Sequence, residues 1–122
     1  MLQVIALVLL SQQPLHPVVE GFASYYTTTS SGTVTASGES LRDDRFTCAM
    51  PDGVFGDYYL IVAENGKSVV CRLNDRGPYV KGRVIDLSKA AMRQLDHRKG
   101  LLRVKVYRLG SQAPPGVIAR SK

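Results

Sequence analysis

The sequence predicts an all-β fold, a small barrel or sandwich with one short helix. Apolar segments of strand length recur along the chain, and turn residues separate them at intervals of roughly ten residues. The segment 89–95 carries a helical pattern instead. The 122 residues match the usual size of one folding unit, so we expect a single domain.

The expected strands are 22–26, 58–63, 68–73, 84–87 and 101–107. The second and third flank Asn65-Gly66, which is a strong signal for a hairpin turn. The last one alternates apolar and basic residues, as is typical of a half-exposed strand. Before it, Ser88 is the expected N-cap of a helix over 89–95, and Gly100 follows that helix.

We expect two segments to flank this body. Residues 1–20 are interpreted as a signal or leader segment or an N-terminal arm, residues 21–109 as the folded domain, and residues 110–122 as a flexible tail. The mostly apolar Met1–Leu10 is shorter than the roughly 20 residues that cross a membrane, so we expect no stable membrane insertion. It fits a signal peptide, which predicts a secreted, periplasmic or cell-envelope protein, and a buried first strand is the alternative.

The two cysteines, Cys48 and Cys71, lack the C-x-x-C or histidine spacing of a zinc site. In an exported chain they are most simply interpreted as one disulfide. That bond would close a loop of about two dozen residues and stabilise the fold by roughly 3 kcal/mol. Two buried free thiols are the alternative.

The net charge of +6 is unevenly distributed along the chain. Residues 1–60 carry two Arg against six acids (−4), whereas residues 61–122 carry fourteen Lys or Arg against four acids (+10). A basic half favours polyanions, but its positive residues are scattered singly, as on a solvated face. Asp75 and Asp86 lie in the middle of this half, which argues against nucleic-acid binding, and we expect none.

Four segments carry more information than strand propensity. In order, they are Gly21-x-Ala-Ser-Tyr-Tyr26, Thr35-Ala-Ser-Gly-Glu39, Asn74-Asp-Arg-Gly-Pro-Tyr79 and Gly82-Arg-Val-Ile-Asp-Leu-Ser88. Together they resemble the RlpA-like (rare lipoprotein A) double-psi β-barrel family, which is related to expansins and family-45 endoglucanases. The resemblance covers about Gly21 to Tyr107 and implies a six-stranded double-psi β-barrel whose groove binds polysaccharide.

The resemblance also implies an activity. RlpA-type proteins are lytic transglycosylases that cleave peptidoglycan strands lacking stem peptides, whereas expansins loosen wall glycans without hydrolysis. By matching motifs, Glu39 and Asp75 correspond to acids implicated in transglycosylase activity, and Asp86 corresponds to a groove acid of expansin-like and endoglucanase barrels. No metal or organic cofactor is implied. The expected partner is peptidoglycan or a related polysaccharide, bound by a monomer.

Carboxyl groups suit this chemistry. Cleavage of a glycosidic bond needs an acid to protonate the leaving oxygen and negative charge to stabilise an oxocarbenium-like transition state. In a lytic transglycosylase the same carboxyl group then acts as base on the sugar's own 6-hydroxyl, which closes an anhydro ring. We assign this acid/base role to Asp75, with Glu39 and Asp86 as positioning or charge-stabilising partners.

The candidate substrate-binding residues are Tyr25, Arg76, Tyr79 and Arg83. Tyr25 and Tyr26 are neighbours on a strand, so only one of them can offer its ring to a sugar in the groove. An Arg76 side chain close to Asp75 would oppose an acid role for that aspartate.

The three acids also have structural interpretations. Asp75 before Arg-Gly-Pro fits a turn cap, and Glu39 in a polar turn fits a solvated surface acid. Asp86 lies just ahead of a helix start, where a carboxylate can accept hydrogen bonds from backbone N–H groups.

One departure from the family pattern bears on catalysis. The family commonly has Ala-Ala-His where this chain has Cys48-Ala49-Met50, so Met50 replaces the usual histidine. A thioether transfers no proton and makes no strong hydrogen bond to orient an acid. Two functions therefore follow from the resemblance: a peptidoglycan lytic transglycosylase, or a non-catalytic, expansin-like module that binds and loosens the wall.

Overall fold

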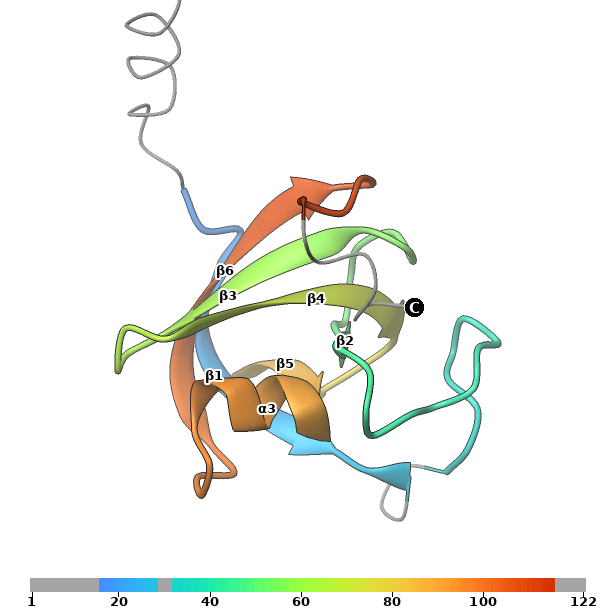
Figure 1. Ribbon diagram of the computed structural model, residues 1–122, viewed down its shortest axis with the longest axis horizontal. Helices are drawn as coiled ribbons and strands as arrows, with labels where there is room; N and C mark the ends of the chain where they lie inside the picture. The colour runs from blue at the N-terminus through green and yellow to red at the C-terminus, as the bar shows by residue number, and fades with distance from the viewer. Residues whose placement is uncertain (1–15, 29–31, 116–122) are drawn as a thin grey trace, which may run out of the picture.

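Six strands close into a barrel in the computed structural model, which describes residues 16–28 and 32–115 (Figure 1). The strands are β1 (Val19–Tyr26), β2 (Thr47–Ala49), β3 (Tyr58–Ala63), β4 (Ser68–Asp75), β5 (Arg83–Ser88) and β6 (Leu102–Gly110). The predicted short helix is α3 (Lys89–Leu95), which packs against β4, β5 and β1. The all-β class is confirmed, and the architecture is a barrel rather than a sandwich.

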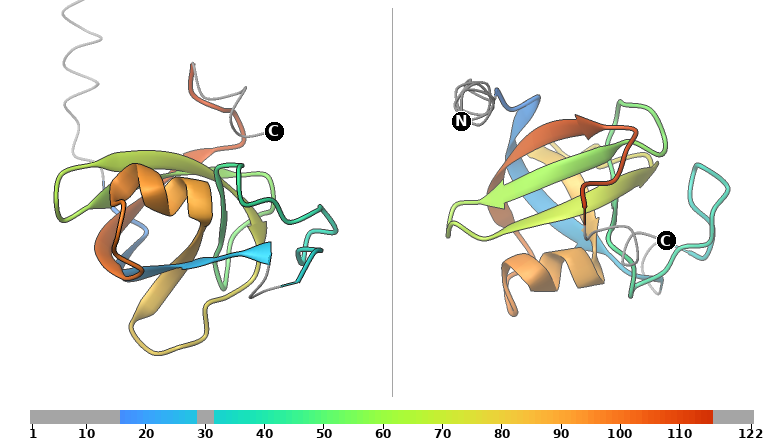
Figure 2. Two further views of the ribbon diagram at one scale, coloured as in Figure 1. Left: turned by 60° about the horizontal axis from the view of Figure 1, so that its bottom comes forward. Right: turned by 45° about the horizontal axis from the view of Figure 1, so that its top comes forward.

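The strand order around the barrel is β1-β5-β2-β4-β3-β6, and β6 pairs with β1 to close it. Of the six pairs of neighbouring strands, β1 with β5 and β2 with β4 are parallel, and the other four are antiparallel. Before β2, residues 32–46 project from the side of the barrel in every view (Figure 2). This projecting segment contains the turn 35–39.

Alternate strand residues fill the interior. In β6 the buried Leu102, Val104 and Val106 alternate with the exposed Arg103 and Lys105, as the sequence pattern predicts. The strands and α3 together supply a single main core, whose largest members include Ile61, Leu73, Ile85, Leu87, Met92 and Leu95.

A disulfide between Cys48 and Cys71 lies within this core and joins the neighbouring strands β2 and β4. The two Cα atoms are 5.8 Å apart, within the usual range for a disulfide, and neither cysteine is exposed. The alternative of two free thiols is therefore wrong.

The helix α3 has the predicted bounds and the predicted cap. Ser88 Oγ accepts a hydrogen bond of 3.2 Å from the Ala91 N–H, which satisfies one of the unpaired donors of the first turn. At the other end, the Asn65 side chain of the β3–β4 hairpin donates to the Leu95 carbonyl at 2.9 Å. The hairpin and the helix end are thereby joined.

Every strand except β3 differs from the sequence prediction. β1 begins at Val19, inside the segment interpreted as a leader or arm, because its first residues pair with β6. β2 is only three residues long and was not predicted, and β4 continues to Asp75, at the edge of the candidate site. β5 is one residue longer at each end than predicted, and β6 begins one residue later and ends three residues later. Residues 1–15 of the expected leader or arm, and the part of the expected tail beyond residue 115, lie outside the described residues. Within the described ranges, no helix is long and apolar enough to cross a membrane.

Candidate functional site

A break in strand register turns Asp75 toward the outer face of the barrel. Cys48 pairs with Leu73, but the next residue of β2, Ala49, pairs with Asp75, so Asn74 is an extra residue in β4. Without this bulge Asp75 would share the inward side of Leu73. Because Ala49 packs in a small cluster outside the main core, its partner Asp75 faces outward as well.

Asp86 reaches the same face from the opposite side of β2. It pairs with Ala49 and lies between the inward-facing Ile85 and Leu87. Asp75 and Asp86 therefore flank Ala49 on its two neighbouring strands. Neighbouring strands lie about 4.8 Å apart. Because β2 lies between them, the Cα atoms of Asp75 and Asp86 are roughly 10 Å apart. We call Asp75, Ala49 and Asp86 the acid row.

The acid row extends to β1 through Ser24. Ser24 is the register partner of Asp86, and its hydroxyl donates a hydrogen bond to Asp86 Oδ1. Ser88 rather than Asp86 caps α3, so the structure does not support the helix-capping interpretation of Asp86. The Asp86 carboxylate is instead tied to the neighbouring strand on the outer face.

The turn 35–39 docks against the end of β4. The Ala36 N–H donates to Asp75 Oδ1 at 2.8 Å, and the Arg76 N–H donates to the same oxygen at 2.9 Å. Asp75 thus caps its own turn, as one interpretation of the sequence held, and also holds the distant turn 35–39. Both bonds use Oδ1 and neither uses Oδ2.

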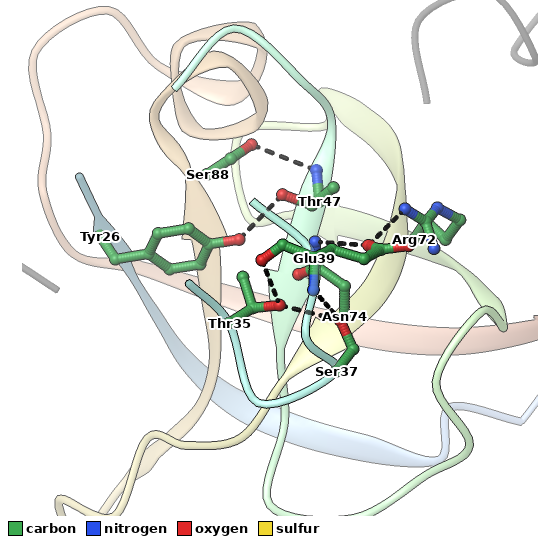
Figure 3. Close-up of polar contacts among 8 residues, drawn as sticks. All are labelled: Tyr26, Thr35, Ser37, Glu39, Thr47, Arg72, Asn74 and Ser88. Carbon is green, nitrogen blue, oxygen red and sulfur yellow. Dashed lines mark hydrogen bonds and ion pairs between the residues drawn. The ribbon is translucent and has the colours of Figure 1, made fainter. Parts of the chain in front are cut away.

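Internal hydrogen bonds shape the turn itself. The Thr35 N–H donates to the Glu39 carbonyl, and the Gly38 N–H donates to the Thr35 carbonyl, both at 2.9 Å. Gly38 has φ +90°, a conformation that glycine adopts without strain. The hydroxyls of Thr35 and Ser37 are hydrogen-bonded to each other at 2.8 Å (Figure 3). This compact turn presents Glu39 to β4.

Glu39 is exposed but paired. Its Oε1 accepts hydrogen bonds from Arg72 Nη2 at 2.6 Å and from Asn74 Nδ2 at 3.1 Å (Figure 3). The hydrogen bond from Arg72, with the Asn74 bond and the Arg72 charge, lowers the pKa of Glu39 below its ordinary 4.5 against the opposing effect of partial burial. Glu39 is therefore an ionised group at neutral pH and a poor proton donor.

Arg76 points away from Asp75. Its Nη2 donates to the Gly53 carbonyl at 2.7 Å, and its guanidinium carbon lies 4.2 Å from the centre of the Phe55 ring. The concern that this cation pairs with the Asp75 carboxylate is thereby removed. The Arg76 side chain, a candidate for substrate binding in the sequence analysis, thus binds the loop after β2.

The structure brings Tyr26, and not Tyr25, to the face of the acid row. Tyr26 is buried, packs with Ala49 and Leu41, and shares a hydrogen bond of 2.9 Å with Thr47 Oγ1 (Figure 3). Burial raises the pKa of Tyr26. The negative charges of nearby carboxylates, including those of the acid row, raise this pKa further, so the hydroxyl stays protonated. Tyr25 packs against the main core, with the Arg93 guanidinium 5.1 Å from its ring centre.

Two pockets are lined by residues that precede and follow Ala49 in the chain. The first, of about 490 Å³, is lined by Glu39, Arg45, Thr47 and Arg72 among others, and we call it the arginine pocket. The second, of about 400 Å³, includes Met50 and Arg83 in its lining. Tyr79, another sequence candidate, is 77% exposed on the loop before β5.

Comparison with known proteins places this geometry in context. The model of the lytic transglycolase family matches residues 18–106. The chain is 43% identical over 98 residues to a probable endolytic peptidoglycan transglycosylase RlpA of Treponema pallidum, covering 79% of this chain and 31% of that protein. It is 38% identical over 97 residues to the endolytic peptidoglycan transglycosylase RlpA of Pasteurella multocida, covering 76% and 33%. The chain thus spans about a third of the length of these relatives.

Solved structures share the barrel. An expansin of Clavibacter michiganensis superposes with a TM-score of 0.61 at 20% identity, over 79% of this chain and 52% of that one. The Streptomyces papain inhibitor superposes with a TM-score of 0.56 at 22% identity, over 78% and 98%. At these identities the likeness concerns the fold alone, and it confirms the six-stranded double-psi β-barrel.

Proposed function

The chain belongs to the lytic transglycolase family of double-psi β-barrels, and from this premise we propose that it cleaves the glycan strands of peptidoglycan by lytic transglycosylation, with Asp75 as the acid/base. The observation that carries the proposal is the acid row. Its two carboxylates, Asp75 on β4 and Asp86 on β5, lie on the same outer face on opposite sides of β2.

The hydrogen bonds of Asp75 leave one of its two carboxyl oxygens for the reaction. Because Oδ1 accepts the N–H groups of Ala36 and Arg76, the proton of the acid form sits on Oδ2. That proton passes to the glycosidic oxygen as the bond to the sugar breaks. Oδ2 then accepts the proton of the sugar's 6-hydroxyl, whose oxygen bonds to the anomeric carbon. The product is an anhydro sugar, and no water is consumed.

The other two acids supply negative charge. Glu39 is kept ionised by Arg72 and Asn74, so it stabilises the positive charge that develops on the sugar rather than donating a proton. Asp86, fixed by the hydroxyl of Ser24, acts in the same way from the other side of Ala49. Both roles require the charged form of a carboxylate.

The relatives support a proposal for the substrate and the location. Proteins named peptidoglycan transglycosylases act in the cell envelope, and an expansin with the same fold has been solved in complex with cellohexaose. We therefore assign this domain to an envelope polysaccharide and propose that the chain is exported. The exposed Tyr79 and the pocket-lining Arg83 remain candidates for contacting the glycan.

A second function is favoured by one observation. Met50, which is 7% exposed, stands where the family commonly has a histidine, and its N–H donates to the Asp75 carbonyl. The residue that pairs with the Asp75 backbone thus carries a thioether, packed in the main core, in place of a group that transfers protons. A barrel with this change would bind wall glycan in the same groove and leave it uncut, as an expansin-like module.

The experiment that separates these functions is product analysis by mass spectrometry. Purified protein is incubated with peptide-free peptidoglycan, beside Asp75→Asn and a control, Glu64→Gln, which alters an exposed acid of the distant β3–β4 hairpin. The transglycosylase predicts anhydro-ended fragments from wild type and Glu64→Gln only. Co-sedimentation with the glycan and no fragments from wild type would establish the binding module instead.

A further inference from the structure

We propose that the arginine pocket is an anion subsite that binds a free carboxylate on the glycan, with Arg45 as the recognition residue. The inference rests on the proposed function, because it names the substituent that is bound beside the same acid row. A pocket of this kind selects its ligand by charge. It would therefore bind a free carboxylate more tightly than a neutral group of similar size.

The charges of the pocket are only partly compensated. Three arginines, Arg42, Arg45 and Arg72, line it together with one acid, Glu39. Arg72 is paired with Glu39 at 2.6 Å, and Arg42 is paired with Asp44 through two contacts of 3.1 Å.

Arg45 is the remaining cation. It forms no ion pair with any residue that the structure describes, and its side chain is only partly exposed. An anion that enters the pocket therefore meets a guanidinium that is not held in an ion pair by any acid of the described residues.

The pocket lies beside the position where the glycan would be cut. Thr47 and Arg72 are register partners on β2 and β4, and both line the pocket. Thr47 is two residues from Ala49, the centre of the acid row, which corresponds to roughly 7 Å along the strand. A substituent on the sugar at the acid row, or on the next sugar, can therefore reach the arginines.

The chemistry of peptidoglycan identifies the anion. Every muramic acid carries a lactyl ether whose carboxyl group is an amide when a stem peptide is attached and a free carboxylate when it is not. A guanidinium matches a carboxylate with two parallel hydrogen bonds, so arginine is well suited to this group. An amide in the same place offers no charge and brings a hydrogen-bond donor toward the cations.

The test compares two substrates that differ in charge and little in size. Soluble peptide-free glycan strands are compared with the same strands after conversion of their carboxylates to methylamides. Binding and the rate of anhydro-product formation are measured for wild type, Arg45→Gln and Arg45→Lys. The matched control is Arg98→Gln, which removes the same charge at an exposed position after α3. Thermal melting confirms that all variants are folded.

We expect wild type and Arg98→Gln to bind the carboxylate strands about tenfold more tightly than the methylamide strands. Arg45→Gln should lose this preference by weakening only the carboxylate complex, and Arg45→Lys should keep part of it. The preference should also fall at high salt, because screening weakens a partly exposed ion pair.

Equal binding of the two strands by wild type, or equal losses in Arg45→Gln and Arg98→Gln, would overturn the anion subsite. Failure of the proposed function gives a different result, because no anhydro product would then form from either strand. The binding preference is measured independently of turnover, so the subsite is tested in both cases.

Discussion

Ala36 and Asp75 are joined by a hydrogen bond of 2.8 Å although they lie 39 positions apart in the chain. The backbone N–H of Ala36 donates to Oδ1 of Asp75, so the turn 35–39 and the end of β4 hold each other in place. The same turn carries Glu39 to Arg72 and Asn74. The position of the catalytic candidates therefore depends on the shape of a turn that contains only one of them.

Gly38→Ala tests that dependence without altering any acid. Gly38 has φ +90°, and nothing lies within 4 Å of an added Cβ, so the substitution introduces backbone strain of about 1 kcal/mol and no clash. We expect product formation to fall roughly tenfold as the turn shifts. Gly66→Ala is the control, since Gly66 has φ +86° and equally open surroundings in the distant hairpin turn. Equal activity of the two variants would contradict a positioning role for the turn.

Arg72→Gln should raise the pKa of Glu39 toward its ordinary 4.5, because the hydrogen bond from Arg72 is the largest influence that lowers it. A carboxyl group with a lowered folded-state pKa contributes stability that is present above 4.5 and is lost as the pH falls through the folded-state value. The difference in melting temperature between wild type and Arg72→Gln should therefore be greatest at neutral pH and shrink below pH 4.5.

The control for this prediction is Arg42→Gln, which removes the exposed ion pair with Asp44. Exposed ion pairs contribute little to stability, so this variant should melt close to wild type at every pH. A difference between wild type and Arg72→Gln that stays constant from pH 7 to pH 3 would show that Arg72 acts by packing rather than through the charge of Glu39.

Met50→His should increase the rate of anhydro-product formation if the missing proton-transferring group limits the chemistry. The new imidazole would add a group that titrates near neutral pH, so the pH–rate profile should gain a limb near pH 6.5. Met50→Leu keeps the buried, apolar character of the position and should leave the rate unchanged. Equal rates and equal pH profiles for the two variants would mean that this position takes no part in proton transfer.

Replacing both cysteines by alanine should lower the free energy of unfolding by roughly 3 kcal/mol, because the Cys48–Cys71 bond closes a loop with a sequence separation of 23. Urea unfolding of the oxidised protein and of the double variant measures this difference. A thiol assay on the native, unreduced protein should detect no reactive cysteine. Two reactive thiols would rule out the disulfide.

The elements with a local signal were predictable from the sequence. Ser88 followed by a helical pattern gave the bounds of α3, and Asn65-Gly66 gave the β3–β4 hairpin. Strand β2, in contrast, has three residues and owes its existence to pairing with β4 and β5. No local pattern marks a strand of that length, and so the strand order of the barrel was not predictable from periodicity.

Motif resemblance singles out Asp75 and Asp86 as candidates, but it does not show that they share a face. That depends on the bulge at Asn74, which is set by the register of two strands that are distant in the sequence. Strand alternation predicts that only one of Tyr25 and Tyr26 faces the candidate site and does not say which. Ser24 and Tyr26 lie on the same face of β1, and the contact between Ser24 and Asp86 shows that this is the face of the acid row.

The most direct test of lytic transglycosylation is the reaction of the wild-type protein with peptide-free peptidoglycan in water labelled with heavy oxygen. Attack by the sugar's own 6-hydroxyl predicts anhydro-ended fragments with no label, and their absence with Asp75→Asn. Fragments with labelled reducing ends would show attack by water, as in a hydrolase, and would contradict the mechanism assigned to the acid row.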